Sequence, residues 1–262
     1  MRRTRIKFCG IRRPEDADAA VALGVDAIGL VLVPGAARAV DLTPAAAIRR
    51  RLPAFVACVA LLRDPQPDWI QQVIEQISPD LLQFHGSEPA ALCSGFGLRW
   101  LKALPMGEEP RCATTARGGP ERPARDEPGQ GQAADSGQGM ADTQTYAGTN
   151  DLERQLAEYR NAAGVVLDGH VPGQPGGQGR SFDWRRVRDW HGPPLILAGG
   201  LSADNVSRAI AQATPFAVDV SSGIETDARL RPGIKDFGRM AEFVAAVRQA
   251  DAATARPMDS HN

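Results

Sequence analysis

The sequence lacks the features that mark membrane proteins, secreted proteins and nucleic-acid-binding proteins. No apolar run reaches the roughly 18 residues that a membrane span needs, and the opening "MRRTRIKFCG" has no apolar segment long enough for a signal peptide. The formal net charge of the 262 residues is −1, which argues against a nucleic-acid partner or an anionic membrane surface. We therefore expect a cytoplasmic protein that binds neither nucleic acid nor a membrane.

Cysteine is also scarce. The chain has four cysteines, at Cys9, Cys58, Cys93 and Cys112, with no CxxC pair and no Cys/His spacing typical of a metal site. Scattered cysteines of this kind are typical of a reducing compartment, and they predict neither a disulfide framework nor a structural metal site. Cys58 lies within an apolar run, which favours a buried structural thiol at that position.

Eight short apolar runs recur along the chain, and most of them are followed by a helical pattern. They cover residues 6–9, 27–33, 55–62, 80–86, 99–105, 164–168, 194–200 and 216–223. Such alternation predicts parallel strands joined by crossover helices, in either an open doubly wound sheet or a closed (β/α)₈ barrel. The count of eight favours the barrel, as does the absence of a G-x-G-x-x-G motif opening a helix after the first strand.

Local signals indicate where several helices begin and end. Pro14 suits the first position of a helix and Gly24 its end, while Thr43 and Ser202 suit the N-caps of later helices. The last expected helix aligns four apolar side chains on one face: Phe237, Met240, Val244 and Val247.

One long stretch cannot contribute to a core. Between Met106 and Leu152 the chain has no Val, Ile, Leu, Phe or Trp, and it is rich in Gly, Gln, Ala and Asp. This composition predicts a disordered insertion at about 107–150, after the fifth strand. We therefore expect a single barrel domain over residues 1–250, interrupted by this insertion, and a flexible tail over 251–262.

Two strand ends carry candidate catalytic residues, because barrel enzymes place their chemistry at the carboxyl ends of the strands. Cys9 ends the first strand and suits a nucleophile or general base if a neighbour lowers the thiol pKa from about 8.5; a buried structural cysteine is the alternative. Asp168 ends the sixth strand, where partial burial would raise its pKa and suit a general acid; capping of the following loop is the alternative. The two strands lie well apart around the ring, so both groups would approach one bound molecule from nearly opposite sides.

Glycine-rich loops follow the sixth, seventh and eighth strands, where barrels commonly bind phosphate. Bare backbone N–H groups and small hydroxyls there predict an anion site, with ordinary turn glycines as the alternative. The candidates are Gly177, Gly179, Gly199, Gly200, Ser222 and Gly223. Arg38, after the second strand, is suited to bind a second anionic group, with a solvent-exposed arginine as the alternative.

Three charged residues and one histidine lie in or beside strands. Lys7, Lys102 and Asp219 are expected to form an inward-facing ionic layer with a structural role, because unpaired charge is costly inside a protein. His85 is expected to be a hydrogen-bonded structural histidine, with a place in the lining of the pocket as the alternative.

Five blocks of the sequence resemble the phosphoribosylanthranilate isomerase family of tryptophan biosynthesis: "KFCGIRRPEDA", "LQFHG", "VVLDGHVPGQPGGQGRSFDW", "LAGGLSADNV" and "AVDVSSGIE…RPGIKD". The resemblance implies a (β/α)₈ barrel that converts N-(5-phosphoribosyl)anthranilate, a phosphorylated small molecule, to 1-(2-carboxyphenylamino)-1-deoxyribulose 5-phosphate. It also implies an Amadori rearrangement with no cofactor and no metal, in a monomer or a homodimer.

The resemblance further implies a role for each matched residue. Cys9 matches the general base, Asp168 the general acid and Arg38 the partner of the anthranilate carboxylate. The backbone phosphate site matches Gly177, Gly179, Gly200, Ser222 and Gly223. Two other interpretations fit the residues alone: another barrel isomerase, epimerase or synthase acting on a phosphorylated sugar, and a regulatory barrel that binds a phosphometabolite without catalysis.

Overall fold

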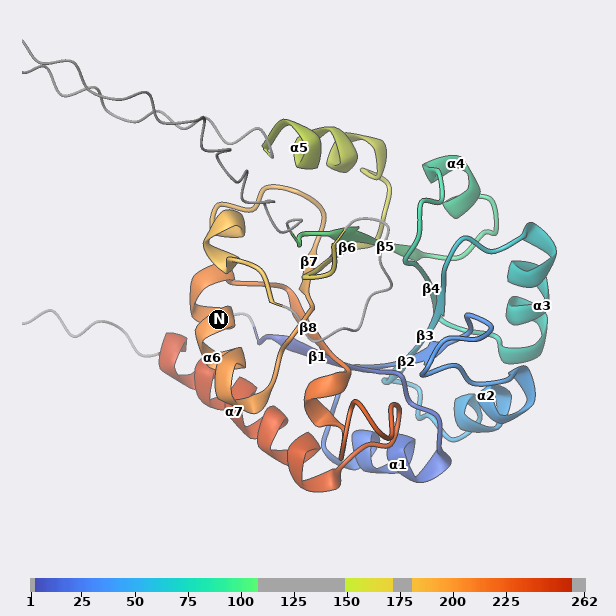
Figure 1. Ribbon diagram of the computed structural model, residues 1–262, viewed down its shortest axis with the longest axis horizontal. Coiled ribbons are helices and arrows are strands. Elements are labelled where there is room, and N and C mark those ends of the chain that lie inside the picture. Colours follow the sequence, from blue (N-terminus) through green and yellow to red (C-terminus); the bar gives the residue numbers. More distant parts are fainter. Residues whose placement is uncertain (1–2, 108–148, 172–180, 256–262) are drawn as a thin grey trace, which may run out of the picture.

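Eight parallel strands close into a barrel in the computed structural model, which describes residues 3–107, 149–171 and 181–255 (Figure 1). The strands are β1 (Arg5–Cys9), β2 (Ala27–Val31), β3 (Ala57–Leu62), β4 (Leu81–Phe84), β5 (Trp100–Pro105), β6 (Gly164–Asp168), β7 (Leu195–Leu197) and β8 (Ala217–Val220). Each strand pairs with its neighbours in the sequence, and β1 pairs with β8 to close the ring. The predicted barrel is therefore confirmed and the open sheet excluded.

The helices lie around the outside of the barrel (Figure 1). They are α1 (Pro14–Ala22), α2 (Leu42–Arg49), α3 (Pro67–Ile77), α4 (Ala90–Cys93), α5 (Thr149–Glu158), α6 (Ala203–Ala213) and α7 (Phe237–Ala255), with 3₁₀ helices η1 (Trp184–Val187) and η2 (Ser222–Ile224). In the described part of the chain, no helix combines the length and apolar character that a bilayer span requires.

The helix boundaries agree with most of the local signals. Pro14 begins α1, and Gly24 follows its end with φ +73°. Ser202 precedes α6, and its backbone N–H donates to Asn205 Oδ1 at 2.9 Å. The prediction for Thr43 was wrong, because α2 begins at Leu42 and Asp41 occupies the N-cap position. Aspartate and threonine are both favourable N-caps, so sequence alone did not separate the two positions.

Side chains of each strand alternate between the inside of the barrel and the surrounding helices. The inside holds a small apolar cluster: Val59, Leu101, Ala103, Val166, Ile196, Ala198 and Ala217. The larger core lies between the outer face of the barrel and the helices. There α7 buries Met240, Phe243 and Val247 completely, whereas Phe237, at its first turn, is 53% exposed and does not belong to the buried face.

The expected ionic layer forms in part. Lys7 and Asp219 face each other across the β1–β8 seam inside the barrel, with Nζ 2.7 Å from Oδ2. Lys102 does not join them, because it shares the outward face of β5 with Trp100, which packs in the outer core. The Lys102 ammonium instead pairs with Glu88 at 2.7 Å.

Several predictions fall wholly or largely on parts of the chain outside the described residues. The insertion expected at about 107–150 lies there except for its ends, as do Cys112, Gly177 and Gly179. Of the expected tail, residues 256–262 lie outside as well, whereas α7 continues to Ala255. The backbone N–H of Thr4 donates to the Asp251 carboxylate at 3.1 Å, which fixes this part of α7 to the start of the barrel.

Candidate active site

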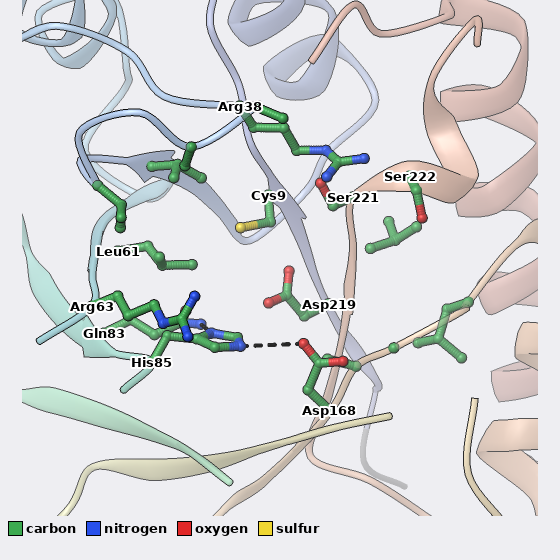
Figure 2. Close-up of a pocket in the computed structure, with 18 of the residues that line it drawn as sticks. Cys9, Arg38, Leu61, Arg63, Gln83, His85, Asp168, Asp219, Ser221 and Ser222 are labelled. Carbon is green, nitrogen blue, oxygen red and sulfur yellow. Dashed lines mark hydrogen bonds and ion pairs between the residues drawn. The ribbon is translucent and has the colours of Figure 1, made fainter. Parts of the chain in front are cut away.

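A cavity of about 590 Å³ opens at the carboxyl ends of the strands, and its size is typical of small-molecule sites (Figure 2). Most of the predicted site residues that the structure describes line it: Cys9, Arg38, Asp168, Gly199, Gly200 and Ser222. Gly223 lines a shallower cavity alongside, which shares Arg38, Gly200 and Ser222 with the first. The structure thus brings together residues from five different loops or strand ends.

Cys9 points into the cavity from the end of β1, and the residue opposite it makes this possible. Gly29 of β2 is its register partner, and a Cβ at Gly29 would lie 2.8 Å from Cys9 Sγ. Only glycine therefore leaves the thiol its space. Gly29 was not predicted to belong to the site, although a glycine inside an apolar strand run is a recognised sign of close approach by another group.

The groups around Cys9 shift the pKa of its thiol in opposite directions. Burial raises the pKa of the thiol, the ammonium groups of Lys7 and Lys235 lower it, and the Asp219 carboxylate raises it. Burial outweighs the two lysines, so the thiol pKa lies above its ordinary value. The expectation that a neighbour lowers the pKa is correct for Lys7 and Lys235 individually and wrong for the net shift.

Asp168 faces the same cavity from β6, three places around the ring from β1 (Figure 2). Its Oδ2 lies 3.3 Å from His85 Nε2 and 3.5 Å from His170 Nδ1. Burial raises the pKa of this carboxyl, but His170 and His85 outweigh the effect of burial and hold the pKa well below its usual range. The predicted net increase is therefore wrong, because two imidazoles lie where only a low-dielectric wall was expected.

Neither histidine was assigned to the site by sequence. For His85 the structure supports the alternative interpretation over the structural one, because His85 lines the cavity and contacts the candidate acid. His170 was not singled out. The available signal was its position in "LDGH", two residues after a strand-ending aspartate.

Arg38 reaches the rim of the cavity, and its guanidinium forms a two-point pair with a buried carboxylate. Nε lies 2.7 Å from Glu225 Oε1 and Nη2 lies 2.9 Å from Oε2. Glu225 also accepts hydrogen bonds from the backbone N–H of Gly233 and from Lys235 Nζ, at 3.0 and 3.1 Å. Glu225 and Lys235 lie in the "SSGIE" and "PGIKD" segments, and sequence reasoning gave neither a role.

The glycine loops after β7 and β8 are in direct contact. Gly199 and Gly200 both have positive φ, at +82° and +62°, a conformation that side chains disfavour. A Cβ on Gly223 would lie 2.0 Å from the carbonyl oxygen of Leu201, so only glycine allows these loops to meet. The described residues predicted to bind an anion therefore lie on two loops whose backbones are in close contact.

The remaining described thiols do not belong to the site. Cys58 and Cys93 are buried away from the cavity, and burial raises the pKa of each to about 12. Both therefore remain protonated thiols at neutral pH. Within the described residues, one set of side chains has the composition and spacing to hold a metal ion, namely His85, Asp168 and His170.

The comparisons with known proteins point to one family. The family model for "N-(5'phosphoribosyl)anthranilate (PRA) isomerase" matches residues 6–118 and 132–246. The chain is 41% identical over 249 residues to the N-(5'-phosphoribosyl)anthranilate isomerase of Halorhodospira halophila, covering 95% of this chain and 99% of the relative. It is 41% identical over 250 residues to the corresponding Pseudomonas putida protein, covering 95% and 100%.

Solved structures give the same result. The phosphoribosyl anthranilate isomerase of Thermotoga maritima is 30% identical with a TM-score of 0.71, covering 94% of this chain and 99% of the other. A phosphoribosyl anthranilate isomerase in complex with reduced 1-(o-carboxyphenylamino)-1-deoxyribulose 5-phosphate is 29% identical with a TM-score of 0.68 and the same coverage. The chain therefore belongs to the N-(5'-phosphoribosyl)anthranilate isomerase family, the isomerases of tryptophan biosynthesis.

Proposed function

We propose that Cys9 is the general base and Asp168 the general acid in the Amadori rearrangement of N-(5-phosphoribosyl)anthranilate to 1-(2-carboxyphenylamino)-1-deoxyribulose 5-phosphate. One observation carries the proposal: the thiol and the carboxyl reach a single cavity from β1 and β6, three places apart around the barrel. A base and an acid on separated walls suit proton removal at one carbon and proton delivery at a nearby oxygen.

The glycine loops hold the substrate phosphate. Among the described residues, the backbone N–H groups of Gly200, Ser222 and Gly223 have no hydrogen-bond acceptor, so they are available to an anion. Gly199, with its positive φ, shapes the same turn. Bare N–H groups bind phosphate well because they lose little side-chain entropy and approach the oxygens closely.

Arg38 pairs with the anthranilate carboxylate at the other end of the substrate. Glu225 holds the guanidinium at the cavity rim through two hydrogen bonds, so the group needs little reordering when substrate arrives. Fixing both ends of a small substrate positions its ribose between Cys9 and Asp168, and such positioning accounts for a large part of enzymatic rate enhancement.

The reaction then proceeds by two proton transfers. Because the pKa of Asp168 lies well below its usual range, its carboxylate must first take up a proton. Asp168 then gives this proton to the ribose ring oxygen, the C1′–O bond breaks, and the nitrogen lone pair forms a C1′=N iminium. The Cys9 thiolate removes the C2′ proton, and the electrons of that C–H bond form the C1′=C2′ enolamine, which tautomerises to the ketose. The iminium acidifies the C2′ proton, so a thiolate is a sufficient base. His85 and His170 are the nearest groups to Asp168 Oδ2 that can exchange a proton with it.

The test is turnover by the purified protein, followed as the loss of anthranilate-type fluorescence. Cys9→Ala and Asp168→Asn should each lower kcat by about 10²-fold or more, with a smaller effect on KM, because each group acts on the transition state. Cys58→Ala is the matched control, since this thiol is equally buried but packs in the outer core. If either site variant kept a turnover within about tenfold of the wild-type value, the substituted residue would not have the proposed catalytic role.

A further inference from the structure

We propose that His85, Asp168 and His170 form a binding site for Zn²⁺, and that the bound ion takes the Asp168 carboxylate out of the reaction. The three side chains come from the loop after β4, the end of β6 and the segment just beyond it. Zinc binding itself does not depend on the function proposed above; only the inhibition rests on the proposed role of Asp168.

The spacing of the ligand atoms fits a zinc ion. In tetrahedral coordination with Zn–N and Zn–O distances of roughly 2.0–2.1 Å, neighbouring ligand atoms lie about 3.3 Å apart. The two distances from Asp168 Oδ2, to His85 Nε2 and to His170 Nδ1, are 3.3 and 3.5 Å. The ligand atoms that the three residues offer all lie within 4.8 Å of one another.

Both imidazole nitrogens that face Asp168 lie near its carboxylate without a well-aligned hydrogen bond. His85 Nε2 and His170 Nδ1 are buried, at 3.3 and 3.5 Å from Asp168 Oδ2, and neither meets hydrogen-bond geometry within the described structure. An N–H on each nitrogen lowers the pKa of Asp168. A bound Zn²⁺ would displace these protons and take the nitrogen lone pairs in their place.

The backbone holds the ligands at fixed positions. The N–H of Gly107 donates to the carbonyl of His170 at 2.9 Å, and the N–H of Met106 donates to the carbonyl of Asp168 at 2.8 Å, which extends the β5–β6 pairing past the strand ends. The N–H of His85 donates to the carbonyl of Leu62 at 2.9 Å. Ligands on such rigid supports lose little freedom when a metal binds.

Gln83 supplies the outer partner that a zinc-binding histidine needs. Its Nε2 lies 3.3 Å from His85 Nδ1, and its Oε1 is buried without a hydrogen bond in the described structure (Figure 2). Turning the amide over would place Oε1 beside Nδ1, where it accepts the N–H and leaves the Nε2 lone pair to the metal. Metal-ligating histidines commonly donate their second N–H to an oxygen in this way.

The donor set selects the ion. Two imidazoles and one carboxylate favour Zn²⁺ over Mg²⁺ or Ca²⁺, which prefer oxygen ligands. Because His85 and Asp168 line the cavity, the fourth coordination position opens toward it and takes water. A bound ion would therefore coordinate the Asp168 carboxylate oxygen, which could then no longer carry the proton that the substrate receives.

The experiment is competition for Zn²⁺ between the full-length protein and a chromogenic chelator. We expect one high-affinity Zn²⁺ per chain, with affinity lowered at least about tenfold by His170→Gln. His191→Gln is the matched control, because this imidazole is exposed and lies outside the set, and it should bind Zn²⁺ as the wild type does. Circular dichroism checks folding, and His85→Gln serves as the second variant if His170→Gln unfolds.

Two results would overturn the site: wild-type protein that takes up no Zn²⁺ at about 100 µM, or uptake that is unchanged in a folded His170→Gln or His85→Gln variant. In a parallel assay Zn²⁺ should inhibit turnover and a chelator should restore it, while Mg²⁺ has no effect. His170-dependent binding without inhibition would support the metal site and contradict the catalytic role proposed for Asp168.

Discussion

Gly29 lies opposite Cys9 in the β1–β2 ladder, and a Cβ on Gly29 would lie 2.8 Å from Cys9 Sγ and 3.1 Å from Lys7 Nζ. The contact with the thiol is too short to persist and the contact with the ammonium is tight, so Gly29→Ala should displace the thiol and shift the ammonium by a few tenths of an ångström. We expect kcat to fall by about tenfold or more while the barrel still folds, because a misplaced base loses much of its effect. Steady-state kinetics and circular dichroism measure the two outcomes.

Gly95→Ala is the control for this substitution. Its Cβ would meet nothing closer than 3.4 Å, and its turnover should equal that of the wild type. A Gly29→Ala enzyme with unchanged kcat would mean that the thiol does not need the space that Gly29 leaves.

Glu225→Gln tests how Arg38 is held. The amide keeps the shape of the carboxylate but removes the negative charge between Arg38 and the fully buried Lys235. Loss of one partner from a buried ion pair typically costs about 3–5 kcal/mol. We expect a lower free energy of unfolding in urea and a higher KM for substrate. The exposed Glu242→Gln on α7 should change neither quantity, and equal stability of the two variants would contradict a structural role for Glu225.

The pH dependence of turnover should reflect both the Cys9 thiol and the Asp168 carboxyl. Burial raises the pKa of Cys9, so the thiolate fraction grows as the pH rises through the neutral range. His170 and His85 hold the pKa of Asp168 below its usual range, so the fraction of protonated Asp168 falls over the same pH range. The two effects offset each other, and we expect kcat/KM to be nearly flat between the two pKa values. A kcat/KM that rises by about tenfold per pH unit from pH 6 to about 9 would mean that Asp168 does not act in its protonated form.

Deletion of residues 109–148 should leave turnover within about twofold of the full chain, because this segment offers almost no large apolar side chains to a core. Kinetics and thermal melting of the shortened protein provide the measurement. A large fall in kcat with unchanged melting would give the segment a part in catalysis.

Much of the fold was predictable because its signals are local. Short apolar runs marked the eight strands, and Pro14 and Ser202 marked helix starts that the structure confirms. The rule that barrel chemistry lies at strand ends also led to Cys9 and Asp168, and the structure places both in one cavity. Neither inference required knowledge of which residues meet across the barrel.

The features that could not be predicted depend on contacts between residues from different strands and loops. The direction of the Asp168 pKa shift is set by His85 and His170, of which His85 reaches it from a different strand end. The space for Cys9 is set by Gly29 on the neighbouring strand, and the orientation of Arg38 by Glu225 after β8. Family membership, shown by the comparisons, replaces the alternatives of another phosphosugar enzyme and a regulatory barrel.

The roles of Cys9 and Asp168 can be tested in a crystal structure with the reduced product analogue 1-(o-carboxyphenylamino)-1-deoxyribulose 5-phosphate. We expect Cys9 Sγ and the Asp168 carboxyl within about 4 Å of the ribulose chain on separate sides, with the phosphate on the backbone of Gly200 and Ser222. An analogue bound with either side chain turned away from the sugar, or with its phosphate on another part of the barrel, would contradict these roles.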